Sequence, residues 1–484
     1  MDRNRINSFF APRSIAVVGA GERPTSSGGA VMQMLRIAGY RGRVVPVNPK
    51  GGEIFGYPAV ASLGAIAEPC ELAVVVIRSD AIPDALREAA ASGHRNILIL
   101  PGGFAEAGAE GQARDAEIRA IAAEHDLLVA GPNCAGLIHL DPAWRFAATF
   151  LRDVPPGVPS GAGNGLALIS QSGALAEEII AKANERKLPL ASVVSVGNAM
   201  HLGIEDYLDH LAREDSIGTI LLYVESVADI ERFRDVARNV AATKPIVALF
   251  GGRTAPGGEA ARAHTGAAIN DDAAIDEFCR ACGMVRVDTL RRMLIAARAF
   301  GRHPQGLGRR TLVLSNSGGP GVLATDRAIQ EGLDLPPLPR PLAEALRAGL
   351  PPEASVANPL DLLADAREER FAATFKAVVE RASDAYDQIL MIHVVPFMVD
   401  AAPVVQALTE VTRDAPFAVM HGMMGTLPGK DEWFAALEAA GIPAYNDVEE
   451  MAEAAGLLAR YPVLRDGLRE PPPRDLRFRA RKGN

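Results

Sequence analysis

The sequence has 484 residues, and 50 lysines and arginines against 59 aspartates and glutamates give a formal net charge of −9. This acidic balance excludes a chain that binds nucleic acid through a basic surface, and 48% hydrophobic residues exclude wholesale disorder. Four cysteines are too few for a disulfide framework. No apolar run approaches the roughly 20 residues of a membrane span, and no signal peptide is recognisable. We expect a cytoplasmic protein of about three domains that binds neither nucleic acid nor membrane.

Apolar runs alternate with helical patterns from the start of the chain. Runs of Val, Ile and Leu predict buried parallel strands at 14–18, 44–47, 72–77, 96–100 and 127–130. Helical patterns lie between them at 81–91 and 107–124. Strand–helix alternation is typical of a doubly wound α/β sheet, and we assign this one to a first domain, residues 1–150.

Two further α/β series follow a linker rich in Pro and Gly at 152–165. The second series has predicted strands at 166–169, 192–196, 219–223 and 246–250 and a helix at 271–281, and the third has strands at 311–314, 388–392 and 417–421. We therefore predict a second domain at 151–305 and a third at 306–465. Residues 466–484 are predicted to be a tail, disordered from Glu470 onward.

One pattern occurs in both later domains. SQSG at 170–173 and SNSG at 315–318 each follow an apolar strand and precede a helical pattern. Free N–H groups at a helix N-terminus bind anions, although the same residues also suit an ordinary tight turn. The repetition favours phosphate handling, and the predicted donors are Ser172, Gly173 and Ala174 in one copy and Gly318, Gly319 and Gly321 in the other.

The first predicted strand runs into Gly19-Ala20-Gly21, which suggests a dinucleotide site. The fingerprint of such a site requires a third glycine where this sequence has Pro24, and an acidic residue where the second strand ends at Asn48. NAD is therefore not the expected ligand. Lys50 offers a cation for a phosphate instead.

The motifs taken together resemble the nucleoside-diphosphate-forming acyl-CoA synthetases and, more distantly, the α subunit of succinyl-CoA synthetase. They are, in chain order, VGA at 18–20, VNPK at 47–50, FGYP at 55–58, GGFAE at 102–106, GPNCAG at 131–136, SQSGAL at 170–175, SVGN at 195–198, YVES at 223–226, GRT at 252–254, AHTG at 263–266, NSGGPG at 316–321 and NPLD at 358–361. Each motif is weak alone, and their order and spacing carry the resemblance.

The resemblance implies an α/β protein of three doubly wound domains, namely a Rossmann-like CoA-binding domain and two flavodoxin-like domains of the succinyl-CoA-synthetase type. It implies a ligase that interconverts acyl-CoA, phosphate and ADP with carboxylic acid, CoA and ATP through an acyl phosphate and a phosphohistidine. His264, in a loop expected over 256–268, matches the phosphorylated residue, and Glu225 matches the carboxylate that holds its ring. Imidazole suits this role because it is largely unprotonated near pH 7.

Coenzyme A is placed by the resemblance on the turns of the first domain. The matching residues are Gly19, Ala20, Gly21, Asn48, Pro49, Lys50, Ile77, Arg78, Asn133 and Cys134. We expect Cys134 to be a small apolar residue rather than a nucleophile. No metal site is predicted, since the CxxC at 279–282 has no second pair, and His201 and His210 are expected to be solvated.

Family members bind the nucleotide in an ATP-grasp domain, fused in some members and a separate subunit in others. The motifs leave no room for it in this sequence. The resemblance therefore implies an ATP-grasp β subunit that brings ATP or ADP with Mg²⁺, in a heterotetramer.

The sequence departs from the family's pattern in four places. Arg78, Phe250 and Ala263 stand where many members have Pro, Lys and Ser, and residues 199–201 (AMH) follow the Gly-Asn pair where many members soon have an Asp. The departures leave the carboxylic acid unassigned. They also leave open a non-catalytic CoA-binding regulatory protein, or an acyl or carbamoyl transferase without phosphohistidine chemistry.

Overall fold

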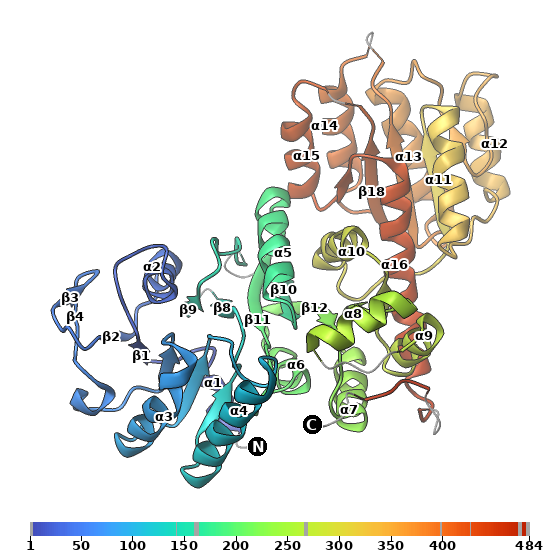
Figure 1. Cartoon of the computed structure of the whole chain (residues 1–484). Helices are drawn as coiled ribbons and strands as arrows, with labels where there is room; N and C mark the ends of the chain where they lie inside the picture. Colours follow the sequence, from blue (N-terminus) through green and yellow to red (C-terminus); the bar gives the residue numbers. More distant parts are fainter. Residues whose placement is uncertain are drawn as a thin grey trace. The chain divides into compact units, whose positions relative to one another are not determined.

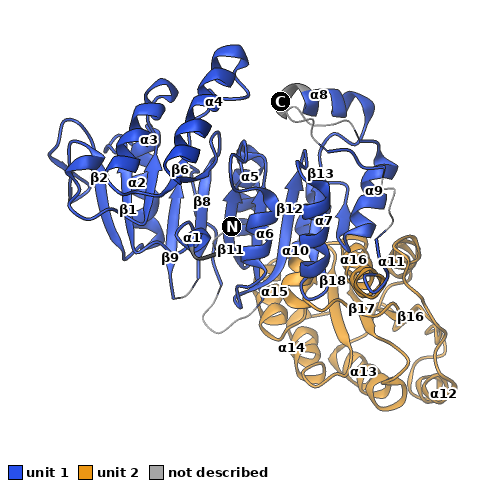
Figure 2. Ribbon diagram, turned by 90° about the horizontal axis from the view of Figure 1, so that it is seen from below, with its two compact units in different colours: residues 1–297, 468–484 blue, residues 298–467 orange. Residues whose placement is uncertain are grey.

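The computed structural model describes residues 3–141, 143–158, 164–265, 270–396, 399–425, 427–472 and 477–480. The chain forms two compact units, residues 1–297 together with 468–484, and residues 298–467 (Figure 2). The end of the chain thus belongs to the first unit. None of the helices in the described ranges combines the length and the apolar composition that a bilayer crossing requires.

The first sheet of unit 1 contains the strands predicted near the start of the chain. Its order is β2 (Arg43–Val47), β1 (Ser14–Val18), β5 (Leu72–Val75), β6 (Asn96–Ile99) and β7 (Leu128–Ala130), all parallel. Val18 aligns with Val47 on one side and with Val75 on the other. Helix α2 (Ser27–Ala38) covers one face, and α3 (Ile82–Ala91) and α4 (Gly108–Glu124) cover the other (Figure 1). The short helix α1 (Arg3–Asn7) precedes β1, and a small hairpin of β3 (Glu53–Ile54) and β4 (Tyr57–Pro58) follows β2.

The second sheet of unit 1 contains three strands that the sequence did not predict. Its order is β14 (Val285–Val287), β13 (Ile246–Phe250), β12 (Ile217–Val224), β10 (Gly165–Ser170), β11 (Leu190–Ser195), β8 (Gly136–Leu140) and β9 (Arg145–Thr149). The strands not predicted are β8, β9 and β14, and β8 pairs antiparallel with β11 and with β9. Residues 136–149, expected within a first domain of residues 1–150, therefore extend the sheet of the next one.

Helices connect the parallel strands of this second sheet. They are α5 (Gly173–Arg186), α6 (Ile204–Leu211), α7 (Ile230–Ala241), α8 (Ala255–Thr265) and α9 (Asp272–Ala281). Helix α10 (Leu290–Arg302) then leads out of unit 1.

Unit 2 is a third sheet with its own core. Its parallel strands lie in the order β16 (Leu360–Asp361), β15 (Thr311–Ser315), β17 (Gln388–His393), β18 (Ala418–Met423) and β19 (Ala444–Tyr445). Its helices are α11 (Gly318–Gln330), α12 (Arg340–Gly349), α13 (Glu368–Ala382), α14 (Ala401–Val411), α15 (Lys430–Ala439) and α16 (Val448–Gly467). When strands are numbered along the chain, the parallel strands of all three sheets follow the doubly wound order 2-1-3-4-5. Ligands of such folds bind at the carboxyl ends of the strands, where the strand order reverses.

The long helix α16 passes through Pro462 without ending. Proline has no N–H to donate to the carbonyl four residues earlier. That carbonyl, of Leu458, accepts instead from the N–H of Leu307 at 3.2 Å. A contact from outside the helix thus satisfies the group that the proline leaves free.

Candidate functional site

The first Ser-x-Ser-Gly turn joins β10 to α5. Ser170 Oγ donates to the Ser172 carbonyl at 2.7 Å and accepts from the Ser172 N–H at 3.1 Å, so the turn closes on itself. Ser172 Oγ caps α5 by accepting from the Leu175 N–H at 3.3 Å. The N–H groups of Gly173 and Ala174 are in the first helical turn, where no carbonyl of the same helix reaches them. This helix end is therefore suited to an anion.

Glu225 is held beside this turn by the residue between the two serines. Gln171 Oε1 accepts from the N–H groups of Glu225, at 2.6 Å, and of Ser226, at 2.9 Å, while its Nε2 donates to the Ser226 carbonyl at 2.9 Å. The Tyr223 hydroxyl donates to Glu225 Oε1 at 3.1 Å. Burial and the neighbouring Glu225 raise the pKa of Tyr223 above its usual range, so the phenol keeps its proton. Glu225 is half-buried, and its position is fixed from β10 as well as from β12.

A hollow lies beside Glu225 at the carboxyl ends of β12 and β13. Its lining includes Gly251, Gly252, Gly258, Ala261, Asn270 and Phe478. A Cβ on Gly251 would lie 2.8 Å from the Tyr223 hydroxyl, so a side chain there would collide with the group that donates to Glu225. Ala261 precedes His264 in the chain and Asn270 follows it. The hollow is therefore lined by residues that precede and follow the predicted phosphohistidine in the chain.

The segment that carries His264 differs from the expected loop. Residues 255–265 form helix α8, so the loop predicted over 256–268 is wrong for that part. Pro256 is tolerated in a first helical turn, and alanine has the highest helix propensity of any residue. His264 lies in the last turn of α8, and its side chain is outside the described part of the chain. Its contact with Glu225 stays a prediction.

The predicted CoA turn is tight and closed by backbone contacts. Gly19 has a φ of 92°, and a Cβ there would lie 2.8 Å from Ile77 Cγ2. Asn48 Nδ2 donates to the Ala20 carbonyl at 2.8 Å, and its Oδ1 accepts from the Lys50 N–H at 3.0 Å. Asn48, which stands where a dinucleotide site would have an acidic residue, thus joins the turns after β1 and β2. The Lys50 side chain is exposed at their edge.

The other predicted CoA contacts of the first sheet lie close to these turns. Gly21 is half-buried and Pro49 is exposed. Arg78 is exposed and forms an ion pair with Asp80. Arg78 thus places a charge after β5, where many members of the family that this sequence resembles have proline.

A polar network links the first sheet of unit 1 to the second. Asn133 Nδ2 donates to Asn198 Oδ1 at 3.3 Å, and Asn198 Nδ2 donates to Glu106 Oε2 at 2.5 Å. Glu106 Oε1 also accepts from the N–H groups of Gly103 and Phe104. Burial would raise the pKa of Glu106, but these hydrogen bonds outweigh it and hold the pKa below its usual value. Glu106 and Asn198 were not among the predicted site residues, although both lie in the quoted motifs.

Cys134 lies inside the protein. It is 4% exposed, and its thiol donates to the Ile99 carbonyl at 3.4 Å. Burial raises its pKa to about 12, which disfavours the thiolate that a nucleophile needs. The next residue, Ala135, lies 3.1 Å from the position of a Cβ on Gly173. The predicted CoA motif at 131–136 and the start of α5 are therefore in contact.

The second Ser-x-Ser-Gly turn, in unit 2, closes as the first does. Ser315 Oγ donates to the Ser317 carbonyl at 2.8 Å and accepts from its N–H at 3.0 Å. The Gly321 N–H bonds to the Ser317 carbonyl inside α11, so this predicted phosphate donor is already used. Gly318 and Gly319 retain the helix-end position. The Asp361 carboxylate lies 3.4 Å from the position of a Cβ on Gly318.

The two histidines and the CxxC cysteines singled out in the sequence lie in unit 1. His210, expected to be solvated, is wrongly predicted: it is 7% exposed and stacks on Phe10 with ring centroids 4.2 Å apart. His201 is half-buried and its Nδ1 accepts from a backbone N–H. Cys279 and Cys282 are both buried and unbonded to each other. Among the described residues no group of three His, Cys, Asp or Glu side chains could hold a metal ion.

Comparisons with known proteins identify the family and the fold. Residues 13–140 match a family described as a CoA binding domain, and residues 162–300 match one described as a succinyl-CoA ligase like flavodoxin domain. Subunit alpha of the ADP-forming acetate–CoA ligase II of Pyrococcus furiosus is 33% identical over 94% of this chain and 97% of its own length. The ADP-forming acetate–CoA ligase I of Archaeoglobus fulgidus is 31% identical over 94% of this chain, which covers 63% of that protein.

A solved structure has the same fold over nearly the whole chain. It is the dinucleotide forming acetyl-coenzyme A synthetase 1 of Ca. Korarchaeum cryptofilum in complex with phosphate and ADP. Its sequence identity is 28% and its TM-score 0.87, with 96% of this chain and 98% of that chain covered.

Proposed function

Because this chain belongs to the family of ADP-forming acyl-CoA ligases, we propose that it is an α-type subunit that carries out acyl transfer and phosphohistidine formation. Phosphate attacks the thioester of acyl-CoA, the C–S bond breaks, and CoA leaves with an acyl phosphate formed. The histidine takes the phosphoryl group and releases the carboxylate, and ADP then takes the phosphoryl group to form ATP. His264 is the proposed phosphorylated residue.

The observation that carries this proposal is the placement of Glu225. Its backbone is held by Gln171 of the turn that starts α5, and its carboxylate is at a hollow lined by Ala261 and Asn270, on either side of His264 in the chain. A carboxylate on one ring nitrogen fixes the tautomer of imidazole and stabilises its charged, phosphorylated form. The N-terminus of α5 supplies N–H donors for the phosphoryl oxygens.

The described residues also fit the CoA half of the reaction. The turn at Gly19 packs so closely on Val76 and Ile77 that only glycine fits there, and Lys50 offers an exposed cation for a phosphate nearby. The 131–136 motif touches the start of α5, so a thioester bound on the first sheet would end near the phosphate donors of the second. The side chain of Cys134 takes no part in this contact, since it faces the core.

The nucleotide half is proposed to come from a partner. One relative is named as a subunit alpha and matches this chain over 97% of its length, whereas this chain covers 63% of another that is not named as a subunit. This chain thus matches almost the whole of a relative named as one subunit, but only part of a longer relative. The difference supports a separate ATP-grasp subunit that brings ATP or ADP with Mg²⁺, in a cytoplasmic heterotetramer. Carboxylates together with nucleotide phosphates are the usual ligands of Mg²⁺.

The test is transfer of the γ-phosphoryl group of labelled ATP to the chain in the presence of Mg²⁺ and a co-expressed ATP-grasp subunit. The wild-type chain should acquire an acid-labile label, and His264→Ala should acquire none while it binds CoA as before. Production of acyl-CoA from a panel of carboxylic acids should be lost in parallel. Turnover that survives His264→Ala would indicate a transferase instead, and CoA binding without label or turnover in the wild type would indicate a regulatory protein.

A further inference from the structure

The last described residues of the chain are folded onto unit 1. The sequence predicted disorder from Glu470 onward, and for residues 477–480 this is wrong. Phe478 is 6% exposed, and its ring stacks on Phe278 of α9 with centroids 4.1 Å apart and 12° between the planes. It also meets the edge of Phe250, at the end of β13, with centroids 5.8 Å apart. Phe478 is therefore part of the core of unit 1.

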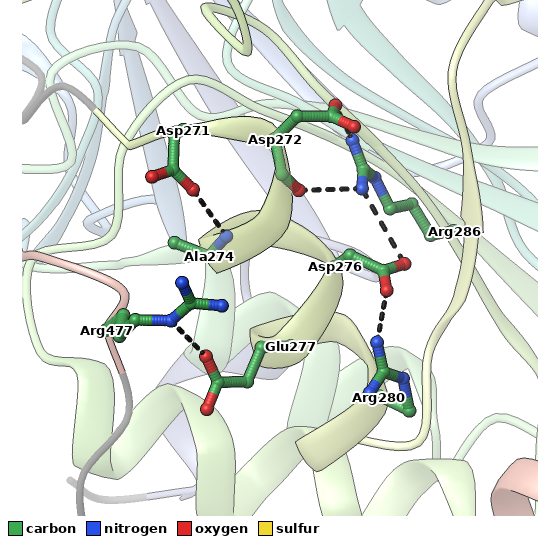
Figure 3. A network of polar contacts seen from close by, with 8 residues as sticks. All are labelled: Asp271, Asp272, Ala274, Asp276, Glu277, Arg280, Arg286 and Arg477. Carbon is green, nitrogen blue, oxygen red and sulfur yellow. Dashed lines mark hydrogen bonds and ion pairs between the residues drawn. The ribbon is translucent and has the colours of Figure 1, made fainter.

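Polar contacts flank Phe478 on both sides. Arg477 Nε donates to Glu277 Oε2 at 2.9 Å, as Figure 3 shows. The Arg479 N–H donates to Asn270 Oδ1 at 2.6 Å, and Asn270 Nδ2 donates back to the Arg479 carbonyl at 3.1 Å. A paired amide contact of this kind fixes one backbone position relative to another.

The helix that receives this segment is itself braced. Asp271 caps α9 by accepting from the Ala274 N–H at 2.7 Å. Arg286 forms ion pairs with Asp272 and Asp276 of the same helix (Figure 3). Upstream of the segment, Arg238 of α7 donates to the carbonyls of Leu468 and Glu470. The segment thus packs on α9 through Phe278 and Glu277, and on Asn270, which precedes that helix.

The surface that the segment completes is the hollow at Glu225. Both Phe478 and Asn270, the partner of Arg479, belong to its lining. We propose that residues 477–480 are a positioning element of the active site, in which Phe478 forms one wall of the Glu225 hollow and Arg479 holds Asn270. This inference rests on the function proposed above.

The physical effect would be twofold. An aromatic wall excludes water beside Glu225, and the lower effective dielectric strengthens the attraction between a carboxylate and a charged imidazole. A fixed Asn270 holds the backbone immediately before α9 in one position, which reduces the entropy lost on reaching a productive geometry. The opposite role, an inhibitory plug, fits less well because Phe478 is packed between Phe250 and Phe278 as core residues are.

The experiment compares two chains shortened at the carboxyl end, each co-expressed with the ATP-grasp subunit. One lacks residues 473–484, and its matched control lacks only 481–484. The first should lose tenfold or more in kcat and in the rate of phosphohistidine formation from labelled ATP, with KM for CoA within twofold. The control should keep the wild-type kcat and the wild-type rate of phosphohistidine formation. Among point variants, Phe478→Ala should behave as the longer deletion, and Phe478→Leu should recover most of the rate.

Hydrogen exchange separates this inference from the proposed function. Loss of residues 473–484 should increase exchange in peptides from α8 and the start of α9, and leave peptides of the first sheet unchanged. Unchanged exchange, unchanged kcat or a faster rate would each overturn the positioning role, and a faster rate would indicate a plug. Failure of the proposed function would show instead as a wild-type chain that is neither labelled nor active, while the exchange comparison still decides whether the segment orders this region.

Discussion

The two Ser-x-Ser-Gly turns share one construction and differ in what they hold. In each, the first serine binds both the carbonyl and the N–H of the second, at distances between 2.7 and 3.1 Å. In each, the middle amide side chain reaches the backbone that follows a neighbouring strand. In unit 1 that backbone belongs to Glu225, and in unit 2 to Val394.

The comparison shows which features the two turns share and which, among the described residues, occur in unit 1 alone. The turn itself provides a helix end, which is suited to an anion in either unit. The residue that the middle amide holds is a carboxylate in unit 1, Glu225, and an apolar residue in unit 2, Val394. The hollow with its bordering glycines lies beside Glu225. The capping also differs, since Ser172 caps α5 through its side chain and Ser317 makes no such bond.

The largest expected effect is that of Glu225→Gln. The amide keeps the size of the side chain and can still accept from Tyr223, but it removes the charge that would stabilise the phosphorylated ring. Loss of one such electrostatic contact costs about 10²–10³ in rate. We expect a loss of this size in phosphohistidine formation from labelled ATP, with CoA binding unchanged. The matched change in unit 2, Val394→Ala, should change the rate less than threefold, and equal losses would break the comparison.

The second expected effect is a pH dependence of unit 2. His393 and His421 are buried with their rings edge to face, and no ring nitrogen of either has a hydrogen-bond partner among the described residues. Burial lowers the pKa of His393 to about 4 and that of His421 to about 3, with His393 and Lys430 adding to the latter shift. The unfolded rings have a pKa of about 6.5, so as the pH falls the unfolded chain binds protons first.

The free energy of unfolding of unit 2 should therefore be at its full value above about pH 6.5 and should decrease as the pH falls toward 4. Each pKa unit corresponds to about 1.4 kcal/mol, so the loss should reach a few kcal/mol. The measurement is hydrogen exchange of β17 and β18 as a function of pH. The double variant His393→Leu, His421→Leu should flatten the profile, whereas His125→Leu in unit 1 should leave it unchanged.

The third effect concerns the amides of the two turns. Gln171→Ala leaves the N–H groups of Glu225 and Ser226 without their acceptor, and Asn316→Ala does the same to Val394. Each unsatisfied buried group costs about 1–3 kcal/mol. We expect Gln171→Ala to lower kcat at least tenfold, whereas Asn316→Ala should destabilise unit 2 in urea with a smaller effect on kcat per folded molecule. The reverse pattern would contradict the assignment of the carboxylate to unit 1.

The smallest effect is that of the caps. Ser172→Ala removes a side-chain cap and should destabilise the first turn of α5 by about 0.5–2 kcal/mol. Ser317→Ala removes no such bond and should be nearly neutral. Hydrogen exchange of the first-turn amides of α5 and α11 measures both effects. Equal losses of protection, each relative to the wild-type chain, would show that the caps do not differ.

The sequence predicted the strands well where apolar residues run continuously, as in Ile246–Phe250, whose bounds are reproduced. It missed β8 and β9 because short strands paired across a sheet edge have no periodicity of their own. It placed a loop over α8 because the stretch is rich in glycine and alanine, although alanine has the highest helix propensity of any residue. His210 was misplaced because the partner that buries it, Phe10, is far away in the chain.

Taken alone, the order of its motifs determines the family of this protein and the residue types its chemistry needs, because those depend on local patterns. The tertiary structure alone decided which of these residues meet. Gln171 reaches Glu225, Asn48 joins two turns, and Phe478 closes a hollow from the far end of the chain. Such contacts join distant parts of the chain, and their energy comes from burial and hydrogen bonds that exist only once the sheets have formed.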